Sequence, residues 1–154
     1  LSLCKSISGK MINSNSHTLL SDREFLILKS NIPFDNNNYN IGLDGVNKPI
    51  DLTVSKGIFN EDSNSKKLLL DINEIKLPLI LRKREEGDYF YPNGMSGKKM
   101  ISKYFKDEKM SYFDKQNQWL LCNGSDVLWI VGMRFDNRKY KTKDANIKIE
   151  FNEV

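Results

Sequence analysis

A chain of 154 residues, of which 39% are hydrophobic and 29% charged, can bury a hydrophobic core without disulfides, which excludes a disordered protein. No apolar run approaches the ~20 residues that a membrane helix needs, so no membrane contact is expected. Cys4 and Cys122 lack CxxC spacing and His17 is the only histidine, which favours reduced thiols in a cytoplasmic protein and argues against a metal site.

The net charge of +4 comes from the C-terminal half of the chain. Residues 1–77 carry 9 Lys/Arg and 9 Asp/Glu, whereas residues 78–154 carry 15 and 11. A cationic surface attracts polyanions by releasing their counterions, and RNA or DNA is the commonest such partner in a cytoplasm. The chain begins with neither Met nor a signal peptide pattern, so we expect a piece of a longer protein whose C-terminal half faces the partner.

Residues 1–76 are expected to form a β-rich connecting segment. The apolar residues Leu19, Leu20 and Phe25–Leu28 flank a short polar turn and predict a hairpin of core strands. Residues 31–49 are rich in Asn, Asp, Gly and Pro, which predicts turns. Apolar runs at residues 50–54 and 68–72 follow.

Residues 77–154 are expected to form a separate domain of the α+β class, with a small mixed or antiparallel β core and one or two helices. Strands are predicted at residues 77–81, 119–122 and 127–131, and the alternation of Ile147, Ile149 and Phe151 predicts a closing strand. Trp119 and Trp129 lie within apolar strands, which favours core positions over base stacking. The charged stretch at residues 106–118 is expected to be a surface connection.

The segment at residues 82–105 concentrates charge, glycine and aromatic side chains. Met100, Ile101, Tyr104 and Phe105 fall on one side of a predicted helix. The opposite side carries Lys99, Lys103 and Lys106. The helix is expected to begin near Ser96 and Gly97, where its N-terminus would bind a phosphate with the help of Lys98 and Lys99. The alternative is a helix that packs on its apolar face and leaves ordinary lysines in water.

A second basic cluster lies beyond the predicted core strands and contains Arg134, Arg138, Lys139, Lys141 and Lys143. Two basic clusters therefore bracket one β core. Between them, Asp88 is expected to bond the backbone of its loop or to orient Arg82 or Arg84. Asp88 and its neighbours are not expected to be catalytic, because no histidine or nucleophile lies nearby in the sequence.

The C-terminal half of the chain resembles a known family. The run LILRKREEGDYFYPNGMSGKKMISKYFKDEKM, followed by VLWIVGMR, resembles the C-terminal domain of tRNA(Ile)-lysidine synthases, and residues 8–28 resemble the segment that leads into that domain. The chain departs from the family pattern at Tyr89, where many relatives carry Arg, and at Met100, where many carry Leu. The matching positions are Arg82 or Arg84, Gly87, Asp88, Pro92, Gly94, Gly97, Lys98, Lys99 and Phe105, then Trp129 and Gly132.

The resemblance implies that the full-length protein is an ATP-dependent carbon–nitrogen ligase that joins lysine to the wobble cytidine of a CAU-anticodon tRNA(Ile). ATP and Mg would be bound by an N-terminal catalytic domain with an SGGxDS loop. No such loop occurs in these residues, so the fragment is predicted to have no cofactor and no catalytic residue of its own. The C-terminal domain would share its fold with part of the phenylalanyl-tRNA synthetase β chain and contact the tRNA acceptor stem.

The expected partners are therefore the tRNA(Ile) acceptor stem, the N-terminal catalytic domain of the same protein and a second copy in a homodimer. Two alternatives stay open. Gly94 and Gly97 form a GxxG that could belong to a KH-like binder of single strands, and the basic face could instead dock on an acidic protein surface. The predicted tRNA-binding residues are Arg82, Arg84, Lys98, Lys99, Lys103, Lys106, Arg134 and Arg138. The predicted structural-loop residues are Gly87, Asp88, Pro92, Gly94 and Gly97.

Overall fold

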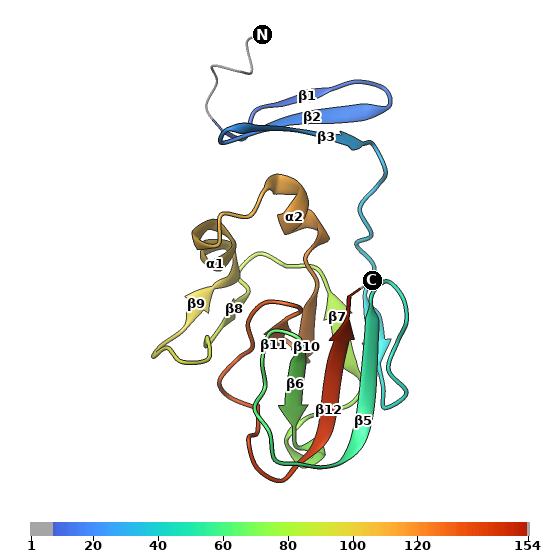
Figure 1. The fold of residues 1–154 in the computed structure, drawn as a ribbon, viewed down its shortest axis with the longest axis vertical. Helices are drawn as coiled ribbons and strands as arrows, with labels where there is room; N and C mark the ends of the chain where they lie inside the picture. The colour runs from blue at the N-terminus through green and yellow to red at the C-terminus, as the bar shows by residue number, and fades with distance from the viewer. Residues whose placement is uncertain (1–7, 154) are drawn as a thin grey trace. The chain divides into compact units, whose positions relative to one another are not determined.

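The computed structural model describes residues 8–153, which divide into two units (Figure 1). One unit contains residues 8–35 and 110–117, and the other contains residues 36–109 and 118–153. The boundary therefore does not fall between residues 76 and 77, where the sequence placed it. The reason is long-range pairing, because the strands of residues 39–41 and 51–59 bond to strands of the C-terminal half.

The smaller unit contains a three-stranded antiparallel sheet of β1 (Met11–Asn13), β2 (His17–Asp22) and β3 (Phe25–Ser30), in that order. The predicted hairpin of β2 and β3 is confirmed. The expectation that all its apolar residues lie in a core is wrong, because Phe25 and Leu28 are 70% and 63% exposed while Leu20 is buried. Neighbouring residues of a strand point to opposite faces, so one sheet cannot bury them all on one side.

The same unit contains helix α2 (Tyr112–Asn117), in a stretch that the sequence predicts to be a surface connection. The hydroxyl of Ser111 accepts a hydrogen bond from the Asp114 backbone N–H at 3.1 Å. The Asp114 carboxylate in turn accepts from the Ser111 backbone N–H at 3.3 Å. This reciprocal bonding is a variant of the capping box that begins helices, with Asp in place of Glu.

The larger unit is built from two main antiparallel sheets. The first has the order β11-β10-β7-β4 and the second the order β5-β12-β6. The strands of the first are β4 (Tyr39–Ile41), β7 (Leu79–Arg82), β10 (Leu120–Asn123) and β11 (Asp126–Ile130). Those of the second are β5 (Asp51–Phe59), β6 (Lys67–Leu70) and β12 (Ala145–Asn152), and a short 3-10 helix, η1 (Ile72–Glu74), follows β6. The strands predicted at residues 77–81, 119–122, 127–131 and 147–151 are confirmed as β7, β10, β11 and β12.

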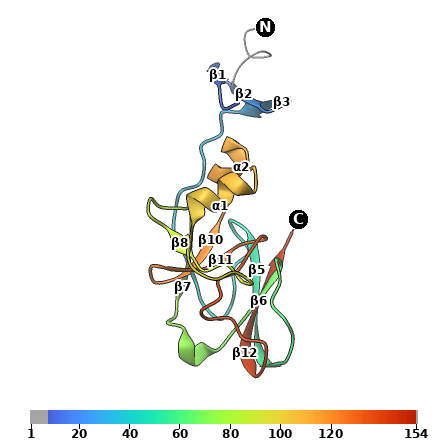
Figure 2. The ribbon, with the colours of Figure 1, turned by 90° about the vertical axis from the view of Figure 1, so that its left-hand side faces the viewer.

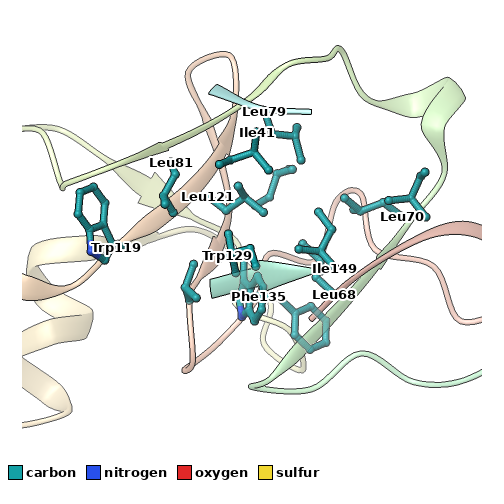
Figure 3. Packing of buried hydrophobic residues seen from close by; sticks show 14 residues of the cluster. Ile41, Leu68, Leu70, Leu79, Leu81, Trp119, Leu121, Trp129, Phe135 and Ile149 are labelled. Atoms are coloured by element: carbon teal, nitrogen blue, oxygen red, sulfur yellow. The ribbon is translucent and has the colours of Figure 1, made fainter. Parts of the chain in front are cut away.

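One hydrophobic core is shared by these two sheets. A side view of the unit separates β7, β10 and β11 from β5, β6 and β12 (Figure 2). Side chains of both sheets meet between them, as Trp129 of β11 and Ile149 of β12 show in Figure 3. Trp129 and Trp119 are 0% and 7% exposed, so both are core residues, as predicted.

A third, two-stranded sheet and a short helix lie beside this core. Strands β8 (Tyr89–Phe90) and β9 (Lys99–Met100) pair antiparallel, β8 contacts β11, and α1 (Ile101–Asp107) follows β9 directly (Figure 1). The predicted α+β class, with a mixed or antiparallel core and one or two helices, is confirmed: the sheets are antiparallel, and residues 77–153 contain the helices α1 and α2. No helix within residues 8–153 is long and apolar enough to span a membrane.

Candidate nucleic-acid interface

The first part of the candidate interface is an arginine–carboxylate clamp at the end of β7. Arg82 is 6% exposed, and its Nη1 and Nη2 donate to Asp88 Oδ2 and Oδ1 at 2.7 and 2.9 Å. The Asp88 carboxylate also accepts from the Glu85 backbone N–H at 2.8 Å, which closes the acidic turn. The hydrogen bond to Asp88 raises the pKa of Arg82 above its usual value. The hypothesis that Asp88 bonds its loop and orients Arg82 is confirmed, and Arg82 faces the protein interior.

The same clamp fixes the start of α1. The carbonyl of Asp88 accepts the backbone N–H of Ile101 at 2.9 Å, and Ile101 is the first helical residue. The helix therefore begins at Ile101 and not near Gly97, because Lys99 and Met100 are paired with β8 in extended conformation. The helix N-terminus predicted near Gly97 is therefore wrong, and no helix N-terminus supports the phosphate site predicted beside Lys98 and Lys99. Ile101, Tyr104 and Phe105 are buried as predicted, whereas Met100 is 40% exposed.

A second clamp holds the loop between β8 and β9. Asp136 is 1% exposed and accepts from the backbone N–H groups of Tyr91 and Arg138 at 2.8 and 2.7 Å. The Arg138 Nε donates to the same carboxylate at 3.0 Å, and its guanidinium lies 4.7 Å from the centroid of the Tyr91 ring. Burial, the largest single influence, lowers the pKa of Arg138, but the hydrogen bond to Asp136 and the charges of Asp136 and Asp126 together raise it above its usual value. Arg138 is therefore held by its own protein on two sides.

Arg134 holds the tip of the same loop. Its Nε and Nη2 donate to the carbonyl of Asn93 at 3.2 and 2.6 Å. Gly94 and Gly97, which follow, have φ of +78° and +82°, a region that only glycine enters readily. Pro92 is buried and Gly87 lies in the acidic turn with φ of +87°. The predicted structural-loop residues thus all lie in these two turns.

The loop geometry excludes the KH-like alternative. A KH domain places its GxxG loop between two helices. Here the loop of Gly94 and Gly97 connects strand β8 to strand β9. The loop does not follow a helix, because residues 89–92 are extended and Tyr89 and Phe90 belong to a sheet.

The cations of the two basic clusters therefore divide into two groups. Arg82, Arg134 and Arg138 bond to carboxylates or carbonyls of the protein. Lys99 is half-buried and its Nζ pairs with Asp107 at 2.8 Å, which lowers the pKa of Asp107. The remaining predicted contact residues are exposed: Arg84, Lys98, Lys103 and Lys106.

Two features of the site were not singled out from the sequence. The first is Asp136, whose contact with Tyr91 spans 45 positions of sequence and gives no local signal. The second is Lys83, whose Nζ lies 3.7 Å from the Trp119 ring centroid. A weak signal existed for Asp136, because an Asp two residues before Arg138 can bond that residue's backbone N–H in an Asx-turn.

The described residues do not fit a magnesium–nucleotide site. Between residues 8 and 153, no group of three or more His, Cys, Asp or Glu side chains is arranged to hold a metal ion. The SGGxDS loop is also missing from these residues. No chemical step is assigned to this interface, which can bind and position a ligand through charge and shape.

Comparisons with known proteins show what the chain is similar to. Residues 79–151 match the family described as the TilS substrate C-terminal domain. A tRNA(Ile)-lysidine synthase of Parabacteroides distasonis is 38% identical over 136 residues, which are 84% of this chain and 31% of that protein. The enzyme of the same name from Bacteroides thetaiotaomicron is 33% identical over 130 residues, which are 84% of this chain and 29% of that protein. The chain thus spans only 31% and 29% of the length of these two relatives.

A solved structure shares the fold. A crystal structure of the TILS C-terminal domain aligns with a TM-score of 0.59 and covers 77% of this chain and 98% of that one. The two sequences are 16% identical, so this likeness concerns the arrangement of strands and helices alone.

Proposed function

Residues 79–151 of this chain belong to the TilS substrate C-terminal domain family, and from that premise we propose that the chain is the tRNA-binding part of a tRNA(Ile)-lysidine synthase. It binds the acceptor stem of tRNA(Ile) and holds the tRNA while a further, catalytic domain joins lysine to the wobble cytidine. That domain binds the ATP and Mg, and this part supplies no catalytic group. We place the protein in the cytoplasm, where its tRNA substrate occurs.

The observation that carries this proposal is the exposure of four cations next to two rigid clamps. Arg84 precedes the acidic turn, Lys98 ends the loop, and Lys103 and Lys106 lie three residues apart on α1. Residues three apart share a helix face, so the two lysines of α1 act together. A-form RNA exposes phosphates and 2′-hydroxyls but hides the base edges of its deep groove. Exposed cations on a fixed scaffold suit contacts of this kind, which position an RNA without reading its sequence.

A salt titration tests the proposal with an RNA hairpin that copies the tRNA(Ile) acceptor stem. Binding through phosphates makes the logarithm of the affinity fall linearly with the logarithm of the salt concentration. We expect the triple variant Lys98→Ala, Lys103→Ala, Lys106→Ala to lower the slope by about 2, since each phosphate contact contributes about 0.7 to 0.9. The control is a triple variant of exposed lysines elsewhere in the unit, Lys48→Ala, Lys56→Ala, Lys76→Ala.

An unchanged slope in the first triple variant would overturn the assignment of these lysines. Failure of the wild-type chain to bind the hairpin at low salt would favour the other open function, docking on an acidic protein surface. Homodimerisation stays a prediction, which sedimentation equilibrium of the chain would check.

A further inference from the structure

An apolar surface lies at the edge of the proposed contact region. Tyr89 of β8 and Met100 of β9 are directly opposite each other in the two-stranded sheet and are 38% and 40% exposed. Cross-strand partners have Cβ atoms about 5 Å apart, so the two side chains are neighbours on one face. Phe90, the next residue of β8, points the other way and is fully buried. Strand alternation thus holds Tyr89 and Met100 outward.

Cations border this surface on both sides. The Lys98 Nζ lies 4.8 Å from the centroid of the Tyr89 ring. The Tyr91 ring meets the Tyr89 ring edge-on at 6.1 Å and is itself covered by the Arg138 guanidinium at 4.7 Å. The two tyrosine rings therefore lie between two cations, and the exposed ring of Tyr89 is the one next to Lys98. An anionic ligand with flat apolar parts complements such a surface, because its flat parts can cover the Tyr89 ring while its negative charge pairs with the exposed Lys98.

We propose that Tyr89 and Met100 form a stacking surface for the unpaired nucleotides at the 3′ end of an RNA stem. This inference rests on the proposed function. In a duplex each base face is covered by its neighbours, so an aromatic side chain can stack only on an unpaired base or at a helix end. A tRNA acceptor stem carries its unpaired nucleotides at its 3′ end.

The position of Lys98 is compatible with this role. Its ammonium group sits on a four-carbon stem with freely rotating bonds. A base can replace it over the Tyr89 ring while the ammonium moves to the adjacent phosphate. The Phe90 side chain holds the stacking surface in place. It is buried on the other face of the strand, and its ring lies edge-on to Tyr104 at 5.3 Å.

Three RNA hairpins of the same stem test the inference with the 154-residue chain: one blunt, one with a four-nucleotide 3′ extension and one with the same nucleotides at the 5′ end. We expect the 3′-extended hairpin to bind about tenfold more tightly than the blunt one. Tyr89→Ala should remove this advantage and leave the affinity for the blunt hairpin unchanged, and Tyr89→Phe should keep it. Tyr112→Ala, which changes a tyrosine 42% exposed in the other unit, is the control.

A fluorescent base gives a direct reading of stacking. With 2-aminopurine as the first nucleotide of the 3′ extension, we expect binding of wild type to quench its fluorescence and binding of Tyr89→Ala to quench it less. Equal affinity of the wild type for all three hairpins would overturn the inference and leave acceptor-stem binding intact. An equal gain from the 5′ extension would overturn the assignment to the 3′ end. Absence of binding to every hairpin would instead overturn the proposed function.

Discussion

The inner and outer sides of the basic segments differ in the kind of cation they carry. On the inner side, Arg82 and Arg138 bond to carboxylates that are nearly inaccessible to water, and Arg134 bonds to a carbonyl. On the outer side, Lys98 and Lys103 are exposed. The planar guanidinium offers several donors in a fixed geometry that matches a carboxylate, whereas the ammonium is a point charge on a flexible stem. Counting positive charges in a sequence therefore overstates the surface available to a ligand.

Cys122 lies on β10 and is fully buried, so its reactivity measures whether solvent reaches the inner side of the basic segments. Burial raises the pKa of this thiol to about 12, against about 8.5 for a free cysteine. At pH 8.5 its thiolate is therefore about a thousandfold scarcer than that of an open thiol. In the variant Cys4→Ser, we expect iodoacetamide to alkylate the native chain at least a hundredfold more slowly than the chain unfolded in urea. Similar rates in both states would show that the inner side is open to solvent.

Breaking the first clamp should cost the most stability. Arg82→Met keeps an unbranched apolar stem but removes the guanidinium and leaves the Asp88 carboxylate, whose side chain is 10% exposed, without its partner. Losing one member of a buried ion pair costs about 3 kcal/mol or more. We expect a loss of about 3 kcal/mol in the free energy of unfolding, measured by urea titration of tryptophan fluorescence, because Trp119 and Trp129 both lie in this unit. Arg84 is exposed and gives the control, because Arg84→Met should change the free energy of unfolding by less than ~0.5 kcal/mol.

Weakening the second clamp should have a smaller effect. Asp136→Asn keeps one oxygen for the backbone donors but brings an amide against them and removes the charge that pairs with Arg138. A buried donor left without a partner costs about 1 to 3 kcal/mol, so we expect a loss of about 2 kcal/mol in the same titration. Asp126→Asn is the matched control, because Asp126 pairs with the same arginine at 3.5 Å from a half-exposed position. Equal losses in both variants would contradict the role given to Asp136.

Much of the larger unit could be predicted from the sequence. The apolar run of residues 127–131 and the alternation of Ile147, Ile149 and Phe151 each predict a strand, and both strands form. Their signals are local, because period-two alternation and β-branched residues indicate strands wherever the partner lies. The two tryptophans were placed correctly by the same argument. The boundary of the domain was not, since pairing of β5 with β12 joins residues nearly a hundred positions apart.

The site could be predicted less well. The sequence indicates the segment, its loop and the contact of Asp88, but it predicts the helix start four to five residues too early. The sequence around Lys99 is typical of a helix start, and only the pairing of Lys99 with Phe90 keeps this residue extended. Charge alone also could not tell Arg134 from Lys98. That difference depends on whether a carbonyl such as that of Asn93 lies within reach, which the fold decides.

The outer side supplies the converse test, with the smallest expected effect on stability. The triple variant Lys98→Ala, Lys103→Ala, Lys106→Ala removes three exposed side chains that lie outside both clamps. Surface substitutions of this kind change stability by about 0.5 kcal/mol or less each, so we expect the urea midpoint to stay close to that of wild type. The same variant should lose affinity for the acceptor-stem hairpin at low salt. Arg82→Met should show the opposite pattern when RNA binding is assayed at urea concentrations below the unfolding midpoint of this variant. Its stability should fall, but the slope of log affinity against log salt should stay that of wild type, because the Arg82 guanidinium neutralises a carboxylate and not a phosphate. A reduced slope in Arg82→Met at full folding would show instead that the buried arginine also contacts RNA, and the division into inner and outer cations would fail.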